Sequence, residues 1–517
     1  MFKKLNIFLK IDYLIVIIFS FLINYYYSNI GVLPQDTFAY YDTAYRILDG
    51  SVPFKDYWTV SGPFIDYYQA LIFYIFGVSW KSYIISGSLI NSLTTISFFY
   101  LLRNFDLNRS YSIFYAICFS ILANPSMGTP FPDHFSAFLS LIGVFCFFIA
   151  IKKEKKIFWI LVPIFFFFAF LSKQSPSSYI LITLLIIIFI YIKISKKLFF
   201  IKYLFISSVF CVFSLLMFLF WNGIEFQQFI YQYILFPKTI AAERINNYTV
   251  TFNSIISQFK FIYIFLVPLI FVFLNYQKLF SQHYKYLYSI FLVLLTIVLI
   301  FHQVVTKNFI FIFFLIPMLT SLIHINTLNS FKQKNFAIII LISFTLILTL
   351  KYNHRFNEER KMLNLENLNL KNKIDAELLH PSLKGLKWIT YEYHQKPMDE
   401  IMLIKESMVE INKDESKKMF LSGFLFFSAA LKQNLNNPSR WPSLLDASNP
   451  DKDNQYYEIY KKFVENLIIS KKIETLYSSR DNKGDIFEEI FKNSCRKTKE
   501  INDFLIKHDI KSCNKKL

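Results

Sequence analysis

Charged residues are scarce in this chain of 517 residues: only 18% are Asp, Glu, Lys or Arg, against about 25% in soluble domains. Glycine and cysteine are also few, at 11 and 5 residues, whereas phenylalanine contributes 62. The apolar surplus lies in long blocks such as FWILVPIFFFFAFL and YILITLLIIIFIYI. Such blocks exclude disorder, collagen-like structure and a disulfide-stapled miniprotein. The composition therefore predicts a mainly α-helical, polytopic membrane protein.

Acidic residues are rare in the first two thirds of the chain. Residues 1–352 hold 26 Lys plus Arg but only 11 Asp plus Glu, whereas residues 353–517 hold 29 and 25. This shift predicts a membrane domain over 1–352 and a small soluble domain over 353–517. A net charge of +19 is also found in nucleic-acid-binding proteins, but here most of it lies in short loops between apolar segments. We therefore expect membrane lipids, and no nucleic acid, as partners.

Eleven segments approach the roughly 20 apolar residues that a helix needs to cross a bilayer. They are 11–30, 81–103, 110–124, 133–151, 157–172, 175–193, 199–221, 259–276, 285–302, 308–324 and 335–351. With a cytoplasmic N-terminus, the inside segments carry 17 of the 26 positive charges, as the positive-inside rule requires. The N-terminal apolar run has no small-residue cleavage site, so we interpret it as an uncleaved first span. The odd number of spans places the C-terminal domain outside, in the periplasm of a bacterial inner-membrane protein.

The apolar segment 64–76 is too short for a twelfth span. Its 13 residues reach about 20 Å of the roughly 30 Å hydrocarbon core. It follows Gly62-Pro63 and ends at Gly77, which favours a short helix in the membrane interface.

The five cysteines divide between the two predicted domains. Cys118, Cys146 and Cys211 fall within predicted spans, where a buried thiol is ordinary. Cys495 and Cys513 are the only two in the C-terminal domain. A disulfide between them fits an oxidising compartment, and two unpaired thiols fit a cytosolic domain.

The predicted spans contain charged residues only at their edges, although ion-coupled carriers usually place such groups near the midplane. Eight of the 11 acidic residues of the membrane domain fall outside, and five of them lie in the first outer loop, residues 31–80. Within this loop, helical spacing of apolar residues over 37–49 predicts an amphipathic helix that Gly50 ends. Asp42 and Arg46 are expected on its polar face as a surface ion pair.

The first outer loop also carries a dense series of motifs. Asp36 stands at the mouth of the first span, and the remaining motifs are Tyr40 or Tyr41, Ala44-Tyr45-Arg46-Ile47-Leu48-Asp49-Gly50, Pro53-Phe54-Lys55-Asp56-Tyr57, Gly62-Pro63-Phe64 and Phe76-Gly77. PDHFSAF at 132–138, LSKQ at 171–174 and the stretch from Lys307 to Pro317 extend the pattern. This pattern resembles the GT-C glycosyltransferases. It is most similar to the bacterial branch with protein O-mannosyltransferases and the lipid A aminoarabinose and core-sugar transferases.

The resemblance implies a GT-C-like helix bundle that moves a sugar, with inversion, from a polyprenyl-phosphate donor to an envelope glycan, lipid or protein acceptor. Such reactions belong to lipopolysaccharide and other polysaccharide biosynthesis. It implies that Asp36 is the base that takes the proton of the acceptor hydroxyl. A plainer interpretation of Asp36 is an N-cap of the following helix. Many relatives carry a second acid where this chain has Thr37, so we predict an enzyme without metal or cofactor.

Further outer-face residues are candidates for substrate contacts. Asp133 would orient the acceptor or share its proton, or would cap a helix. Beside it, His134 is a candidate acceptor contact, and the pair has no third metal ligand in view. The candidates for binding the donor phosphate are Lys173, Arg244, His302 and Lys307. The alternative for each is a side chain that anchors its helix at the membrane edge. The candidates for sugar contacts are Tyr40, Tyr41, Asp56, Tyr57 and Trp58. For the aromatic residues among them, the alternative is a belt of aromatic side chains at the membrane interface.

Two remaining regions carry weaker signals. The loop 222–258 is either a lid over a substrate cavity or a pair of surface helices. The C-terminal domain is expected to be a small α/β module, which relatives use in acceptor binding. Its predicted elements are a helical neck over 355–379, helices at Lys384–Tyr393, Asn454–Ile469 and from Ile486, and strands at Lys418–Ser422 and Ile473–Tyr477.

Other functions remain open at this stage. A lipid-linked glycan flippase or exporter is disfavoured by spans bare of midplane charge. A polysaccharide polymerase or ligase would be expected to keep its key arginines in late outer loops, whereas the Asp36 loop dominates here. A non-catalytic scaffold would have the same helix bundle without catalytic residues.

Overall fold

The structure is a computed structural model, and it describes residues 2–123, 127–247, 251–275, 283–306, 312–327, 334–442, 447–480, 490–491 and 495–513. Contacts divide the chain into two compact units of three segments each. Unit 1 is Met1–Ser28, Gly87–Leu215 and Asn247–Met362, and unit 2 is Asn29–Ser86, Leu216–Asn246 and Leu363–Leu517. The first loop therefore belongs to the same unit as the C-terminal domain, a grouping that composition did not reveal.

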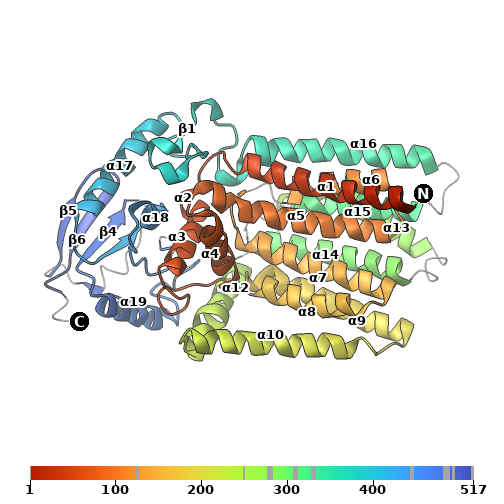
Figure 1. Cartoon of the computed structure of the whole chain (residues 1–517), viewed down its shortest axis with the longest axis horizontal. Helices are drawn as coiled ribbons and strands as arrows, with labels where there is room; N and C mark the ends of the chain where they lie inside the picture. Colours follow the sequence, from red (N-terminus) through yellow and green to blue (C-terminus); the bar gives the residue numbers. More distant parts are fainter. Residues whose placement is uncertain are drawn as a thin grey trace. The chain divides into compact units, whose positions relative to one another are not determined.

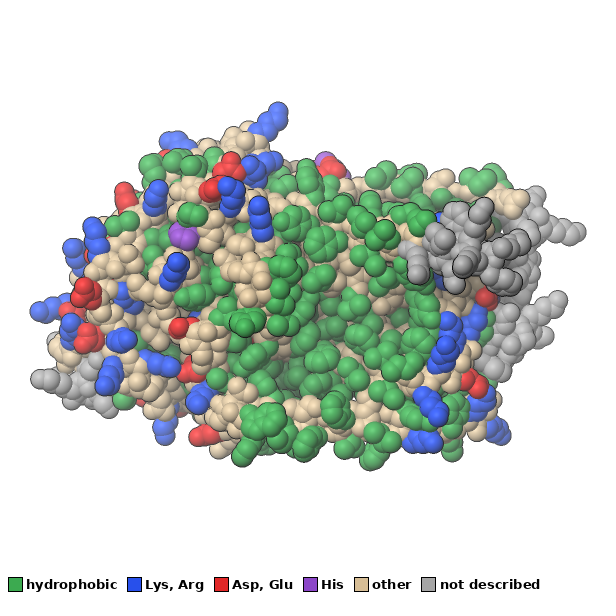
Figure 2. All heavy atoms as spheres, in the orientation of Figure 1, with side chains coloured by type: hydrophobic (Ala, Val, Ile, Leu, Met, Phe, Trp, Pro, Cys, Tyr) green, Lys and Arg blue, Asp and Glu red, His purple; other side chains and the backbone are tan. Residues whose placement is uncertain are grey.

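Long apolar helices form unit 1, and Figure 1 shows α1, α5, α7 and α10 with nearly parallel axes. The helices of the bundle are α1 (Phe2–Tyr27), α5 (Trp80–Asn104), α6 (Arg109–Ala123), α7 (Pro132–Lys153), α8 (Lys156–Phe170), α9 (Gln174–Ser195), α10 (Ile201–Trp221), α13 (Gln258–Asn275), α14 (His283–Thr306), α15 (Leu315–Thr327) and α16 (Lys334–Asn353). Helices satisfy their own backbone hydrogen bonds, which a lipid environment requires. Hydrophobic side chains cover most of the visible surface of these helices in Figure 2.

Among the described residues, seven helices are long and apolar enough to cross a membrane, and each coincides with a predicted span. They are Trp80–Asn104, Pro132–Lys153, Gln174–Ser195, Ile201–Trp221, Asn253–Ile270, Tyr284–Thr306 and Asn335–Leu363. The other four predicted spans fall on shorter apolar helices of 10–17 residues, at Ile11–Tyr27, Arg109–Ala123, Lys156–Phe170 and Ile312–Asn326. The protein is thus mainly helical and membrane-embedded, while the count of eleven spans stays a prediction.

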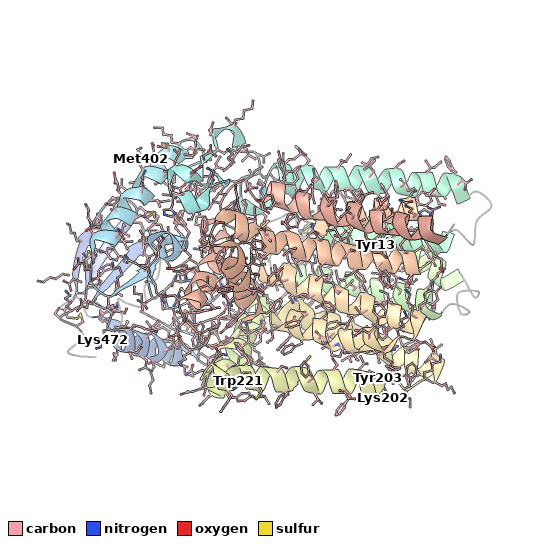
Figure 3. All side chains as sticks on the ribbon, viewed as in Figure 1. Tyr13, Lys202, Tyr203, Trp221, Met402 and Lys472 are labelled. Carbon is pink, nitrogen blue, oxygen red and sulfur yellow. A yellow bond between two sulfur atoms is a disulfide. The ribbon has the colours of Figure 1, made fainter. Side chains whose placement is uncertain are left out.

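Helix α10 shows how one of these helices suits a bilayer. Figure 3 places Lys202 and Tyr203 at one end of α10 and Trp221 at the other. Between them, large apolar side chains such as Phe205, Phe210 and Phe213 are exposed. Apolar flanks with charged and aromatic ends are typical of a lipid-facing helix.

Helix α7 lies at the centre of unit 1. Every side chain from Pro132 to Ile151 is buried, and α7 contacts α8, α9 and α14. Gly143 permits the close approach of α8, because a Cβ atom there would lie 2.9 Å from the ring of Phe166. The chain therefore places Asp133 and His134, at the first turn of α7, among several helix ends.

Unit 2 contains three helices of the first loop: α2 (Pro34–Thr37), α3 (Ala39–Leu48) and α4 (Phe64–Phe76). The helices predicted over 37–49 and 64–76 are confirmed as α3 and α4. Gly50, with φ +86°, follows the end of α3, and Gly77, with φ +79°, follows α4. Of the segment 222–258, unit 2 contains α11 (Phe226–Ile230), the π-helix η1 (Tyr231–Leu235) and α12 (Phe236–Asn246), whereas the π-helix η2 (Asn253–Ser257) belongs to unit 1.

The C-terminal domain is an α/β module, as predicted. Its sheet has the strand order β3-β4-β6-β5, with β3 parallel to β4 and the other pairs antiparallel. The strands are β3 (Lys418–Leu421), β4 (Thr475–Ser479), β5 (Lys497–Glu500) and β6 (Leu505–Asp509), and the helices are α17 (Pro397–Lys413), α18 (Phe427–Leu431) and α19 (Tyr457–Lys471). Helix α19 links the two parallel strands and packs Val464, Leu467 and Ile468 into the core beside the sheet.

Two predicted elements of this domain differ from the structure, and one helix was not predicted. The predicted neck 355–379 is wrong as one long helix: the π-helix η5 (His354–Glu358) covers only its first residues. Short turns and strand β1 (Ile374–Asp375) follow, with Arg360, Asn364 and Asn367 at positive φ. The predicted helix Lys384–Tyr393 is also wrong, because strand β2 (Lys387–Trp388) pairs with β1 there. Helix α17 was missed, although Pro397 at its start and Lys413 in its last turn are standard helix signals. Ile486 lies outside the described residues.

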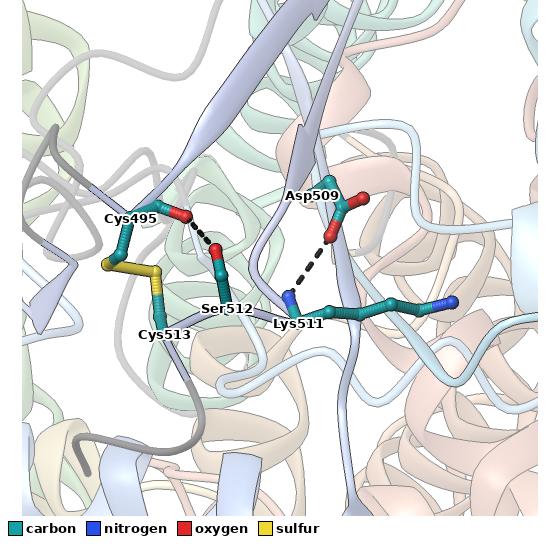
Figure 4. Close-up of a disulfide and its surroundings, with 5 residues drawn as sticks. All are labelled: Cys495, Asp509, Lys511, Ser512 and Cys513. Carbon is teal, nitrogen blue, oxygen red and sulfur yellow. Dashed lines mark hydrogen bonds between the residues drawn. A yellow bond between two sulfur atoms is a disulfide. The ribbon is translucent and has the colours of Figure 1, made fainter.

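The disulfide between Cys495 and Cys513 is present, with a Cα–Cα distance of 5.1 Å (Figure 4). The Ser512 hydroxyl donates to the carbonyl oxygen of Cys495, and the amide of Lys511 donates to Asp509. The crosslink ties the end of the chain to the segment before β5. Cys118, Cys146 and Cys211 are buried free thiols, as the sequence predicted.

Candidate functional site

The strongest cluster of predicted site residues begins with Asp133 in the first turn of α7. Phe131 occupies the N-cap position and Pro132 the first helical position, so the interpretation of Asp133 as a helix cap is wrong. The Asp133 side chain is only 1% exposed. A buried carboxylate needs a cation or hydrogen-bond donors to stay ionised, and both are present here.

Lys173 supplies the cation. Its ammonium group donates to both carboxylate oxygens of Asp133, at 2.8 and 2.7 Å. Lys173 lies between α8 and α9, and its carbonyl oxygen accepts hydrogen bonds from Ser136 and Ser177 at 2.9 and 2.8 Å. The backbone of Lys173 is thus anchored to α7 and α9, which aims the side chain at Asp133.

His302 approaches the same carboxylate from a third direction. Its Nε2 atom lies 3.4 Å from Oδ1 of Asp133, and its ring contacts Tyr179 of α9 at 5.9 Å between centroids. His302 stands near the end of α14, four residues before the last residue of that helix. A loop residue, Lys173, and a residue of α14, His302, therefore converge on the Asp133 carboxylate of α7.

Exposure distinguishes the members of this Asp133–Lys173–His302 cluster. The side chains of Asp133 and His302 are 1% and 0% exposed, whereas that of Lys173 is 20% exposed. An anion that entered the cluster would therefore meet the Lys173 ammonium first. Because the same ammonium neutralises Asp133, an arriving phosphate would compete with the carboxylate for it.

His134 lies beside Asp133 but turns to different neighbours. Its ring stacks on Phe138, with centroids 5.7 Å apart, and contacts Phe131 at 5.5 Å. The side chain is fully buried. This aromatic packing is the role that the structure describes for His134, and its predicted contact with an acceptor stays a prediction.

Asp36 belongs to unit 2, where it lies in the four-residue helix α2. Its side chain is half-buried. Phe38, not Asp36, takes the N-cap position of α3, so the interpretation of Asp36 as the N-cap of that helix is wrong. The role of Asp36 as a base stays a prediction.

The aromatic residues predicted to contact sugar are buried in unit 2. Tyr40, Tyr41, Tyr57 and Trp58 are all 0–1% exposed. Trp58 packs against Phe236, Tyr460 and Phe463, with ring centroids 5.2–6.0 Å apart. Core packing, rather than an exposed aromatic surface, accounts for these rings in the structure.

Asp56, another predicted sugar contact, forms a hydrogen bond and an ion pair within unit 2. One carboxylate oxygen accepts the amide hydrogen of Val52 at 2.8 Å, and the other lies 2.9 Å from the Lys471 ammonium of α19. The adjacent turn is held by Gln232, whose side chain donates to the carbonyl of Phe54 and accepts from the amide of Thr59. Residues of the predicted lid up to Asn246 belong to unit 2 with the first loop, and Gln232 packs on that loop.

The other two predicted phosphate ligands are not described as part of this cluster. Arg244 is a half-buried residue of α12 in unit 2, whereas Lys173 and His302 belong to unit 1. Lys307 lies outside the described residues. Of the four candidates, the structure brings together Lys173 and His302.

Buried charges in unit 2 were not anticipated from the sequence. Asp42 and Arg46 form the predicted i,i+4 pair, at 3.6 Å, but with 3% and 1% side-chain exposure they are not on the surface. Burial raises the pKa of Asp42, and the Arg46 guanidinium opposes that shift. A second pair joins Asp66 of α4 to Arg440, and both side chains are fully buried. The sequence carries no local signal for this pair, because its members lie 374 residues apart.

Across the described residues, no three His, Cys, Asp or Glu side chains are grouped to hold a metal ion. The prediction of a metal-independent enzyme stays a prediction. No protein-family model matches this chain and no curated protein matches it either.

Proposed function

We propose that this chain is a GT-C type inverting glycosyltransferase of the bacterial inner membrane. It takes a polyprenyl-phosphate sugar as donor and an envelope glycan, lipid or protein as acceptor. The observation that carries the proposal is the Asp133–Lys173–His302 cluster, a cationic group at the ends of membrane helices beside a buried carboxylate. A phosphate on a polyprenyl chain has its charge at this depth, where a partly exposed lysine suits it.

The transfer needs one base and one phosphate ligand. The acceptor oxygen forms a bond to the anomeric carbon, and the bond from that carbon to the phosphate oxygen breaks. The electron pair leaves with polyprenyl phosphate, and Lys173 stabilises the negative charge that builds there. Asp36, in the first loop, takes the proton of the attacking hydroxyl.

Asp133 changes partners during this sequence. In the resting protein, Lys173 occupies both of its oxygens. When the donor phosphate takes the ammonium, the Asp133 carboxylate is released to hydrogen-bond the acceptor. His302, 3.4 Å away, remains beside Asp133 and supports its negative charge.

The short helix α8 supports the proposed topology of eleven spans. Ser136 and Lys173 join α7 to the loop after α8, and Glu154 and Lys197 pair between the loop before α8 and the end of α9. The segment 154–173, which contains the 15-residue α8, therefore runs from the end of α9 to the first turns of α7. With eleven spans and an inside N-terminus, the C-terminal domain is periplasmic, where the Cys495–Cys513 disulfide would be maintained.

The decisive experiment compares purified parent protein with Asp36→Asn on labelled polyprenyl-phosphate sugars. We expect the parent to release polyprenyl phosphate and Asp36→Asn to lose at least about a hundredfold in rate, as for other positioned bases. Asp49→Asn is the matched control, because Asp49 is an acid at the end of α3 in the same loop. Equal release by parent and Asp36→Asn would refute the assignment of Asp36.

The alternative functions give different results. A flippase would move a labelled lipid-linked glycan across proteoliposomes without releasing polyprenyl phosphate. A reporter fused after Leu517 should be active only in the periplasm, and cytoplasmic activity would overturn the topology.

A further inference from the structure

Backbone pairing holds the chain just before Asp36. The amide of Gly31 donates to the carbonyl of Lys387 at 3.0 Å, and the amide of Val32 donates to that of Ile389 at 2.9 Å. The amide of Lys387 in turn donates to the carbonyl of Asn29 at 2.8 Å. Residues 29–32 thus extend the β-structure of the C-terminal domain, and Asp36 follows four residues later.

Aromatic packing holds the chain just after Asp36. Phe38 is fully buried, with ring centroids 4.9 Å from Phe426 and 6.1 Å from Trp388. The Trp388 indole donates to the carboxylate of Glu400 on α17 at 2.7 Å. Both flanks of Asp36 are therefore fixed by residues of the C-terminal domain.

Arg440 fixes the two helices that follow. Its guanidinium pairs with Asp66 of α4, donates to the Ser61 hydroxyl, and lies 4.7 Å from the ring centroid of Tyr40 on α3. The Thr43 hydroxyl of α3 donates to the second oxygen of Asp66 at 2.5 Å. One arginine from the C-terminal domain thus links α3 to α4.

We propose that the C-terminal domain is the element that positions Asp36, acting through the Trp388 packing and the Arg440–Asp66 pair. This inference rests on the proposed function only for the role of Asp36 as base. In relatives the domain was expected to help bind the acceptor, whereas the contacts here hold the loop that carries the base. Arg440 and Trp388 are accordingly positioning residues.

The test uses full-length variants that leave the site residues unchanged. Arg440→Gln removes the charge from the pair, and Arg440→Lys retains it. Trp388→Phe keeps an aromatic ring but loses the hydrogen bond to Glu400. Arg480→Gln is the matched control, because Arg480 pairs with Glu500 and Asp503 on the exposed edge of the sheet.

Two measurements separate positioning from loss of fold. The first is the alkylation rate of a Gln35→Cys probe by a membrane-impermeant maleimide. The three free cysteines are buried and should give little background. The second is the rate of transfer, with separate kcat and KM for the donor.

We expect Arg440→Gln and Trp388→Phe to raise probe labelling several-fold and to lower kcat about tenfold, since small displacements of a catalytic group reduce rates strongly. Donor KM should stay within about twofold, because Lys173 is unchanged. Arg440→Lys should recover part of kcat, and Arg480→Gln should match the parent.

Unchanged labelling and kcat in Arg440→Gln and Trp388→Phe, with the parent active, would overturn the inference. Equal losses in kcat and in the amount of folded protein, without recovery in Arg440→Lys, would also overturn it. If the parent transfers no sugar but labelling still rises in both variants, the positioning of the loop stands and the proposed function fails.

Discussion

The Lys173 ammonium donates a hydrogen bond to each carboxylate oxygen of Asp133, at 2.8 and 2.7 Å, although 40 residues separate the two along the chain. A carboxylate and a cation that were each predicted as a separate substrate ligand thus form one ion pair, in which Asp133 is buried and Lys173 is partly exposed. The relationship gives Lys173 two partners in the proposed reaction, Asp133 at rest and the donor phosphate when bound.

Lys173→Gln should destabilise the protein, because it leaves the Asp133 carboxylate buried without its cation. Breaking a buried pair costs about 3–5 kcal/mol, and the partial exposure of Lys173 reduces our expectation to about 1–3 kcal/mol. Asp133→Asn/Lys173→Gln should recover part of this loss. Thermal unfolding in detergent measures the effect, with the exposed Lys155→Gln as control. Additive losses in the double variant would show that the two residues are not coupled.

Asp133→Asn should strengthen binding of a polyprenyl phosphate, since the donor phosphate no longer competes with a carboxylate for Lys173. We expect a several-fold lower Kd, and a several-fold higher Kd in Lys173→Gln. Titration with undecaprenyl phosphate in detergent measures both. Weaker binding by Asp133→Asn than by the parent would contradict the competition.

Trp58→Ala should lower stability by about 3–5 kcal/mol, because it removes a fully buried indole from the core of unit 2. Trp58→Phe should retain much of the packing and most of the transfer activity. Thermal unfolding and transfer assays on the two variants distinguish packing from sugar contact. A stable Trp58→Phe with strongly reduced transfer would favour the original prediction of a sugar contact.

Reduction of the Cys495–Cys513 disulfide should loosen the end of the C-terminal sheet. A crosslink with a sequence separation of 18 is expected to stabilise by about 3 kcal/mol. Limited proteolysis of parent and Cys495→Ser/Cys513→Ser, with and without reductant, measures this. Only the parent should respond to the reductant, and an equal response by both proteins would contradict the prediction.

The stability of the C-terminal sheet should fall as the pH is lowered through the range from about 6.5 to 4. Burial lowers the pKa of His508 to about 4, and Arg496 adds to the effect. Below its ordinary pKa of about 6.5, the unfolded chain binds a proton that the folded chain binds only near pH 4. The loss should reach roughly 1–2 kcal/mol after allowance for solvent screening.

His508→Gln should remove this part of the pH dependence, because glutamine does not titrate. Proteolytic stability of the domain measured from pH 7 to pH 4 provides the comparison. The hydroxyl of Thr498 lies 2.9 Å from His508 Nδ1, so Thr498→Val tests whether that contact contributes. Parallel pH curves for parent and His508→Gln would contradict the assignment.

Much of the fold was predictable wherever local sequence decides conformation. Apolar periodicity predicted helices α3, α4 and α19 and strands β3 and β4. Glycine at the ends of α3 and α4 added to the prediction of those two helices. The errors lie where distant pairing decides. Residues 384–393 were predicted to form a helix, yet Lys387 and Trp388 form a strand because β1 and the first loop supply its partners.

The candidate site was predictable as a set of residues but not as an arrangement. Residue type and position at the membrane edge marked Asp133, Lys173 and His302 separately. Their convergence depends on how α7, α9 and α14 pack, and no spacing along the chain encodes it.

The sequence by itself determined that this is a membrane protein of long apolar helices, because the bilayer demands such segments whatever their neighbours. It also determined that acidic residues concentrate in the first loop. Only the tertiary structure decided which charges meet. Asp42, Asp66, Arg46 and Arg440 look like surface residues in the sequence, and they became buried partners because the first loop and the C-terminal domain fold into one unit.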